Sequence, residues 1–167
     1  MKWLVTAVLL FVLPAFAAAG GEQPQLDRSK EFTYVLPDGW KTIPELKTKH
    51  DVFLIPADDG KNRNLVVNDQ PGKSALPELK AKYEVDLAKA LKDFKLVSSD
   101  LVKWDDREAI RIIHTNSAPG IPVRQVNYVV EIGAKRYFVA ATTLAEDDDN
   151  YDAAVEEFAK SIAAPAE

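Results

Sequence analysis

Two kinds of hydrophobic periodicity organise the chain. In its first part, apolar and polar residues alternate over 31–36, and short apolar runs follow at 51–55 and 65–67. Alternation with a period of two, and short apolar runs between turn residues, are typical of β-strands. Turn residues such as Pro37-Asp38-Gly39 separate these segments. The pattern therefore predicts three strands in this part of the chain.

The period changes after residue 75. Large apolar residues then recur at intervals of three and four over 76–94, which places one apolar stripe along a helix. The members of the stripe are Leu76, Leu79, Tyr83, Leu87, Leu91 and Phe94. A second stripe of the same kind predicts a closing helix and consists of Tyr151, Val155, Phe158 and Ile162.

Between the two helices the pattern predicts four strands, over 95–104, 108–115, 123–131 and 136–142. The breaks between them are short, whereas a parallel connection needs a crossover of about a dozen residues or more. Neighbouring strands of this block should therefore be antiparallel. The whole order predicts an α+β fold, a single domain over 31–163 in which helices pack on a mostly antiparallel sheet.

The N-terminus has the three-part order of a secretory signal peptide. Lys2 provides a positive start, residues 3–13 are apolar except for Thr6, and small residues over 15–19 offer cleavage sites. The apolar run is about half the ~20 residues that a membrane-spanning helix requires. We therefore predict a signal peptide over 1–19, no stable membrane span after its cleavage, and a periplasmic or secreted mature protein. The polar segment 20–30 predicts a flexible leader.

Composition excludes several functional classes. The chain has no cysteine, so disulfides, thiolate metal sites and cysteine nucleophiles are impossible. Its net charge of -5 does not attract phosphate backbones, so we expect no nucleic-acid partner. With 47% hydrophobic and 28% charged residues, the composition is that of an ordinary globular domain.

Residues that could carry catalysis are sparse. His50 and His114 are the only histidines, and a zinc or general-base role would need partners close in space. We interpret them as one surface residue and one satisfied residue near a strand end. Three acidic residues at one turn, Asp105, Asp106 and Glu108, leave a carboxylate-based hydrolase as a weak alternative.

The acidic run Glu146, Asp147, Asp148 and Asp149 could supply oxygen ligands to calcium. It lacks the alternate ligands, central glycine and distal glutamate of an EF-hand loop. The second interpretation is that the run caps the last helix and favours the positive end of its dipole.

Two further features have both a structural and a functional interpretation. The segment 116–122 predicts a loop whose Pro119, Ile121 and Pro122 could contact a partner, although it could equally be a plain connection. Trp40 and Trp104 are expected to pack in the core, and the alternative for them is an exposed aromatic anchor.

Several short sequence patterns also resemble a known family. They are Phe32-x-Tyr34-x-Leu36-Pro37-x-Gly39-Trp40, Asn64-Leu65-Val66-Val67, Phe94-Lys95-Leu96-Val97-Ser98-Ser99, Ala109-Ile110-Arg111, Gln125-Val126-x-Tyr128 and Tyr137-Phe138-Val139-Ala140. In these residues and in its order of elements, the chain resembles the PsbP-like family, which includes extrinsic subunits of the oxygen-evolving complex and exported bacterial proteins of the DcrB type. The resemblance implies an α/β/α sandwich with a central antiparallel sheet. It also implies a non-enzymatic role in binding or assembly, and it suggests no cofactor.

Three functional hypotheses follow. The first is an exported, non-enzymatic binding or assembly module whose partner is an envelope protein or a small ligand. The second is the carboxylate hydrolase, and the third is a calcium-responsive module that uses the run over 146–149.

Overall fold

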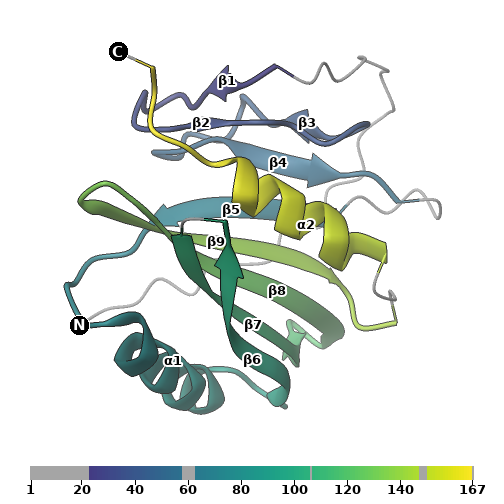
Figure 1. Ribbon diagram of the computed structural model, residues 1–167. Coiled ribbons are helices and arrows are strands. Elements are labelled where there is room, and N and C mark those ends of the chain that lie inside the picture. The colour runs from purple at the N-terminus through teal and green to yellow at the C-terminus, as the bar shows by residue number, and fades with distance from the viewer. Residues whose placement is uncertain (1–22, 58–62, 106, 147–149, 167) are drawn as a thin grey trace.

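The computed structural model of the protein describes residues 23–57, 63–105, 107–146 and 150–166 (Figure 1). The predicted signal peptide therefore lies outside the described residues, and so do Asp106 and three members of the acidic run, Asp147, Asp148 and Asp149. No helix within the described ranges is long and apolar enough to cross a membrane.

A seven-stranded antiparallel sheet forms the centre of the described structure (Figure 1). Its order from one edge to the other is β3 (Lys41–Thr42), β4 (Val52–Ile55), β5 (Arg63–Asp69), β9 (Lys135–Leu144), β8 (Ile121–Ile132), β7 (Arg107–Ala118) and β6 (Lys95–Trp104). A separate two-stranded sheet consists of β1 (Gln25–Leu26) and β2 (Thr33–Tyr34). The four consecutive strands β6 to β9 form the antiparallel block that the sequence predicts.

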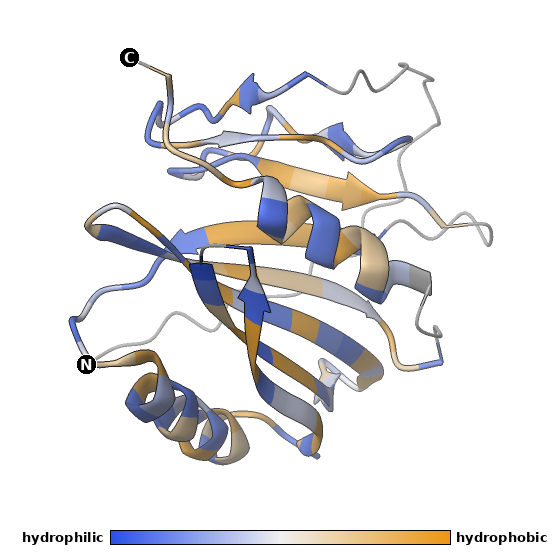
Figure 2. Ribbon diagram, in the orientation of Figure 1, coloured by the Kyte–Doolittle hydropathy of each residue, from blue (hydrophilic) through white to orange (hydrophobic). Residues whose placement is uncertain are grey.

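The helices α1 (Leu76–Ala90) and α2 (Asn150–Ser161) cover opposite faces of this sheet. Successive side chains of a strand point to opposite faces. On β7, Ile112 accordingly packs in the cluster of α1, whereas Ile113 packs in the cluster of α2. In Figure 2, β4 is orange and both helices carry blue and orange residues, as expected of helices with one buried side. The predicted α+β fold, an α/β/α sandwich, is confirmed.

The main core lies between α2 and the sheet, and aromatic rings dominate it. The ring of Phe158 lies 4.8 Å from that of Phe53, 5.7 Å from that of Tyr34 and 5.9 Å from that of Trp40. Trp40 and Trp104 are 5% and 7% exposed, which confirms their predicted packing role. Burial of one such apolar side chain contributes about 1.5–3 kcal/mol.

The structure corrects two predictions about loops. Part of the predicted leader 20–30 packs within the fold, because β1 pairs with β2 and Asp27 is 1% exposed. The predicted loop over 116–122 is a tight hairpin in which Ala118 pairs with Ile121. Gly120 occupies its turn with φ of +82°, a conformation that glycine adopts without strain. Segment 20–30 is rich in polar residues, and segment 116–122 is rich in proline and small residues. Neither composition reveals the strand pairing.

Candidate functional site

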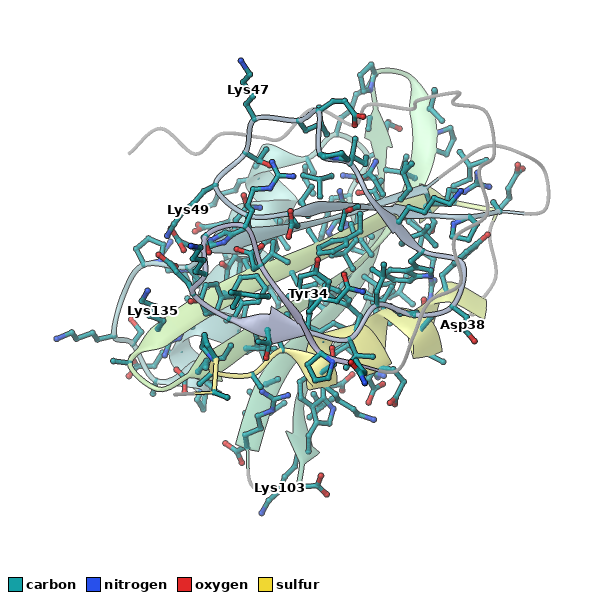
Figure 3. All side chains as sticks on the ribbon, turned by 90° about the horizontal axis from the view of Figure 1, so that it is seen from above. Tyr34, Asp38, Lys47, Lys49, Lys103 and Lys135 are labelled. Atoms are coloured by element: carbon teal, nitrogen blue, oxygen red, sulfur yellow. The ribbon has the colours of Figure 1, made fainter. Side chains whose placement is uncertain are left out.

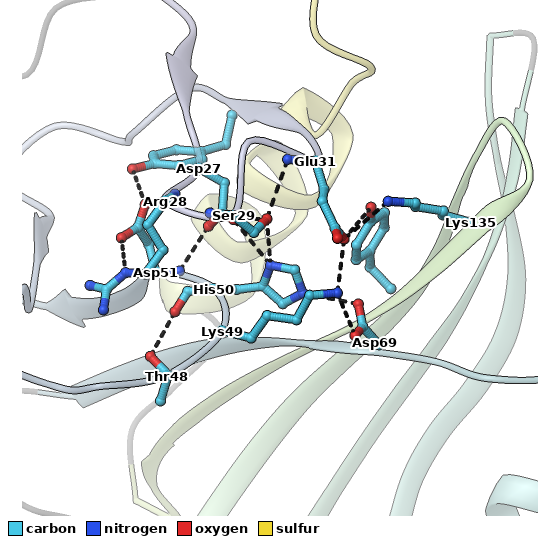
Figure 4. A network of polar contacts seen from close by, with 12 residues as sticks. Asp27, Arg28, Ser29, Glu31, Thr48, Lys49, His50, Asp51, Asp69 and Lys135 are labelled. Atoms are coloured by element: carbon cyan, nitrogen blue, oxygen red, sulfur yellow. Dashed lines mark hydrogen bonds and ion pairs between the residues drawn. The ribbon is translucent and has the colours of Figure 1, made fainter.

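A buried histidine connects the N-terminal segment to the sheet. His50 lies two residues before β4 and is 2% exposed. Its Nδ1 lies 3.0 Å from Oδ2 of Asp27, and its Nε2 lies 3.0 Å from Oδ1 of Asp69 at the end of β5 (Figure 4). Because each ring nitrogen faces a carboxylate, the arrangement favours the doubly protonated imidazolium.

Asp27 is the most enclosed member of this network. Its Oδ1 accepts the backbone N–H of Asp51 at 2.8 Å, and its Oδ2 accepts the backbone N–H of Ser29 at 2.8 Å. Burial alone would raise the pKa of Asp27, but the hydrogen bonds from His50, Asp51 and Ser29 outweigh burial and lower the pKa to about 2. Burial alone would likewise lower the pKa of His50, and the bonds to Asp27 and Asp69 raise it instead.

A neighbouring ion pair extends the network toward the loop over 43–50. The Nε of Arg28 donates to Oδ1 of Asp51 at 2.7 Å, and the hydroxyl of Tyr34 donates to Oδ2 of the same carboxylate at 3.2 Å. The guanidinium of Arg28 also donates to the carbonyl of Leu46 at 2.5 Å. These partly buried charges therefore join Arg28, near the start of the domain, to the loop before β4.

The solvent side of His50 carries a second layer of charge. The ammonium of Lys49 lies 3.0 Å from Glu31 and 2.7 Å from Asp69, and Lys135 lies 3.3 Å from Glu31. Glu31, His50 and Asp69 offer ligand atoms within 4.8 Å of one another, so these three residues could hold a metal ion. However, the ammonium of Lys49 already contacts both carboxylates, and a protonated imidazole has no lone pair for a metal. The geometry therefore fits a proton and an ammonium better than a divalent cation.

The buried contacts of His50 with Asp27 and Asp69, here called the clamp, hold the N-terminal segment against the sheet and are suited to a structural role. A general base has to reach the proton that it abstracts, and His50 is almost fully enclosed. The sequence does not reveal the clamp, because Asp27 and Asp69 are separated from His50 by 23 and 19 residues. The prediction that one histidine lies on the surface is wrong, since both histidines are buried.

His114 lies on the other face of the sheet, where it is 0% exposed. Its Nε2 accepts a hydrogen bond of 3.0 Å from Nδ2 of Asn127, and its ring lies 5.1 Å from that of Phe94. Burial lowers the pKa of His114 to about 4, so the ring is neutral at pH 7. The alternation of His114 with Ile110 and Ile112 was the sequence signal for this position.

The predicted acidic sites do not form an enclosed cluster in the described part of the chain. Asp105 and Glu108 are both exposed at the turn between β6 and β7, and Asp105 has φ of +44°. Glu146 is exposed before α2. The other three residues of the predicted calcium site, Asp147, Asp148 and Asp149, lie outside the described residues.

Exposed aliphatic side chains gather along β6. Leu96, Val97 and Leu101 are 45%, 53% and 42% exposed, and Ile121, at the neighbouring hairpin, is 40% exposed. Among the described strands, β6 has a neighbour on one side only, which is β7. A β-bulge interrupts their pairing between Leu96 and Ser98. The outer side of β6 therefore offers unpaired backbone groups beside apolar side chains.

Comparison with solved structures identifies the fold. CyanoP, the cyanobacterial PsbP of Synechocystis sp. PCC 6803, aligns with a TM-score of 0.59 and 13% sequence identity, over 92% of this chain and 99% of CyanoP. The chain has a PsbP-like fold.

Two other structures share this PsbP-like fold. LpqN of Mycobacterium tuberculosis, described as involved in cell envelope biogenesis, aligns with a TM-score of 0.57 and 16% identity, over 80% of this chain and 83% of LpqN. Protein PA94 of Pseudomonas aeruginosa, of unknown function, aligns with a TM-score of 0.58 and 17% identity, over 69% of this chain and 83% of PA94. Comparison of the sequence with protein-family models and with curated proteins finds no match. At these identities, the structural likeness extends to the fold alone.

Proposed function

We propose that the mature protein is an exported, non-enzymatic binding or assembly module that recruits a protein partner through β6. Export is supported by the signal-peptide pattern over 1–19 and by the PsbP-like fold, which LpqN, a protein of cell envelope biogenesis, shares. The observation that carries the proposal is the concentration of exposed aliphatic residues on an edge strand of ten residues.

The occupant that fits this surface is an extended strand of another protein. An edge strand offers a row of backbone donors and acceptors, so a partner strand gains main-chain hydrogen bonds. Alternate side chains then provide specificity, and Leu96, Val97 and Leu101 would be covered by apolar residues of the partner. Burial of apolar area contributes about 25 cal/mol per Å², which favours a partner that covers all three.

The charges on β6 favour a different protein over a second copy of this chain. A two-fold antiparallel pairing centred on Ser99 would place Lys95 opposite Lys103 of the other copy. A pairing centred on Asp100 would place that carboxylate opposite itself. Like charges directly opposite each other are destabilising, so the middle registers of β6 oppose self-association.

Site-specific photo-crosslinking in the protein's own cells tests the proposal. The full chain carries p-benzoylphenylalanine at Val97 or, as the control, at Glu157, which is an exposed residue of α2. We expect one adduct of defined mass from position 97, its loss in a chain that also carries Leu101→Lys, and no such adduct from position 157. Equal adducts from both positions, no adduct from position 97, or an adduct with the mass of a homodimer would each overturn the proposal.

Cell fractionation and mass spectrometry of the same tagged chain test export. We expect the protein in the envelope or the medium, shortened by residues up to about Ala19. A protein of full length in the cytoplasm would contradict the export part of the proposal.

A further inference from the structure

A cleft of about 580 Å³ lies between the turn that joins β6 to β7 and the C-terminal end of α2. Its volume is within the range of roughly 300–1,000 Å³ that is common for small-molecule sites. Its lining combines apolar and basic side chains and consists of Lys103, Trp104, Asp105, Arg107, Ile132, Lys160, Ile162, Ala163 and Ala164.

The apolar side of the cleft is built on rigid elements. Trp104 ends β6, Ile132 ends β8, and Ile162 directly follows α2. The indole N–H of Trp104 donates to Glu156 of α2 at 3.1 Å, and its ring lies 5.4 Å from that of Tyr128. These contacts fix the orientation of the indole, which is 7% exposed, so the accessible part of the ring is a preformed apolar part of the cleft.

Basic side chains outnumber acidic ones in the lining of the cleft. Lys103, Arg107 and Lys160 come from three different elements, and Asp105 is the one acidic residue of the described lining. Lys103 projects into solvent at the edge of the molecule (Figure 3). The ammonium of Lys160 lies 3.2 Å from Glu156 and 3.0 Å from Glu157, and these two carboxylates offset its charge.

Arg107 belongs to the framework of the cleft. It donates to the carbonyl of Ile162 at 2.7 Å and to the carbonyl of Lys160, at the C-terminal end of α2. Its guanidinium also lies 5.5 Å from the centre of the Trp104 ring. It therefore offsets the partial negative charge at the end of the helix, which would otherwise oppose an anion in the cleft.

We infer that this cleft binds a small amphipathic anion, namely a carboxylate on an aliphatic or aromatic body. The body packs against Trp104 and Ile132, and the carboxylate meets the ammonium groups of Lys103 and Lys160. A monoanion fits better than a phosphate, because lysines act as single point charges and the cleft combines them with an apolar wall. This inference goes beyond the proposed function and holds whether or not β6 recruits a protein.

Calorimetric titration of the protein purified from its own cells tests the inference with three probes that share one body. The probes are 4-phenylbutyrate, 4-phenylbutanol and 4-phenylbutylamine. We expect 4-phenylbutyrate to bind most tightly and the amine most weakly. Because exposed ion pairs contribute modestly, the double variant Lys103→Gln, Lys160→Gln should weaken binding of 4-phenylbutyrate by about tenfold. It should leave the affinity for 4-phenylbutanol unchanged. Lys47→Gln, at an exposed lysine outside the cleft, is the matched control and should change neither.

Two further measurements locate the probe. Binding of the carboxylate should change tryptophan fluorescence, and Trp104→Phe should remove that change while circular dichroism shows that the variant is folded. Three results would each overturn the inference. They are equal affinity for the carboxylate and the amine, no effect of the double lysine variant, and no saturable binding at about 10 mM, a concentration that still detects very weak sites.

Discussion

Replacement of His50 by glutamine should destabilise the protein, and by an amount that depends on pH. His50 holds two carboxylates at 3.0 Å while it is 2% exposed. Hydrogen bonds to charged groups contribute about 1.5–3 kcal/mol each, and glutamine can replace one of the two. Asp27 keeps its backbone donors in the variant, so it does not become a wholly unpaired buried charge. We therefore expect a loss of about 2 kcal/mol at pH 6.

The sign of the pH dependence follows from the raised pKa of His50. A group whose pKa is higher in the folded state binds protons more tightly there. Its stabilisation is complete below the unfolded pKa of about 6.5 and is lost as pH rises through the folded pKa. The destabilisation caused by His50→Gln should therefore be largest near pH 6 and should shrink toward pH 9.

Urea denaturation followed by tryptophan fluorescence, at pH values from 6 to 9, measures this effect. Lys47→Gln serves as the control and should follow the wild-type profile, because Lys47 is exposed. A His50→Gln variant with the same loss at pH 6 and at pH 9 would show that the histidine is not charged in the fold. A variant as stable as wild type would refute the clamp itself.

Three other substitutions test the rest of the structure. The wild-type protein should lose stability as pH falls from 6.5 to 4, because the unfolded chain protonates His114 while burial holds its folded pKa at about 4. In urea denaturation, His114→Gln should reduce this pH-dependent loss. A variant whose free energy of unfolding falls over this range as steeply as that of wild type would contradict the assignment. Phe158→Ala should lower the free energy of unfolding by about 3–5 kcal/mol in thermal or urea denaturation, since it empties the centre of the aromatic core, and a loss below about 1 kcal/mol would contradict that packing. Gly120→Ala should cost about 1 kcal/mol from backbone strain, because a Cβ there meets nothing within 4 Å, and a stabilised variant would show that the turn differs.

Local pattern was sufficient where an element has one buried side. The first stripe predicted α1 and the second predicted α2, because a helix that covers a sheet must repeat its apolar residues every three or four positions. The predicted first helix ran to Phe94, whereas α1 ends at Ala90. The short breaks between β6 and β9 also determined their antiparallel pairing, since no crossover fits in them.

Pattern failed where polar residues are buried by their partners. Asn116 is 5% exposed within β7, although the small residues and prolines that follow it were typical of a loop. Asp27 lies in the polar segment 20–30, and that polarity was typical of a leader. For Asp27, compensating contacts come from His50 and Asp51, 23 and 24 residues away, and sequence neighbours do not reveal them.

The sequence by itself therefore determined the α+β class, the order of most elements and the secretory pattern of the N-terminus, all of which depend on local periodicity and composition. Only the tertiary structure decided that His50 lies between Asp27 and Asp69, that β6 is an edge among the described strands, and that Lys103 and Lys160 line one cleft. The physical reason is that electrostatic and edge contacts depend on distances in space between residues far apart in the chain. No periodic pattern in one sequence encodes those distances.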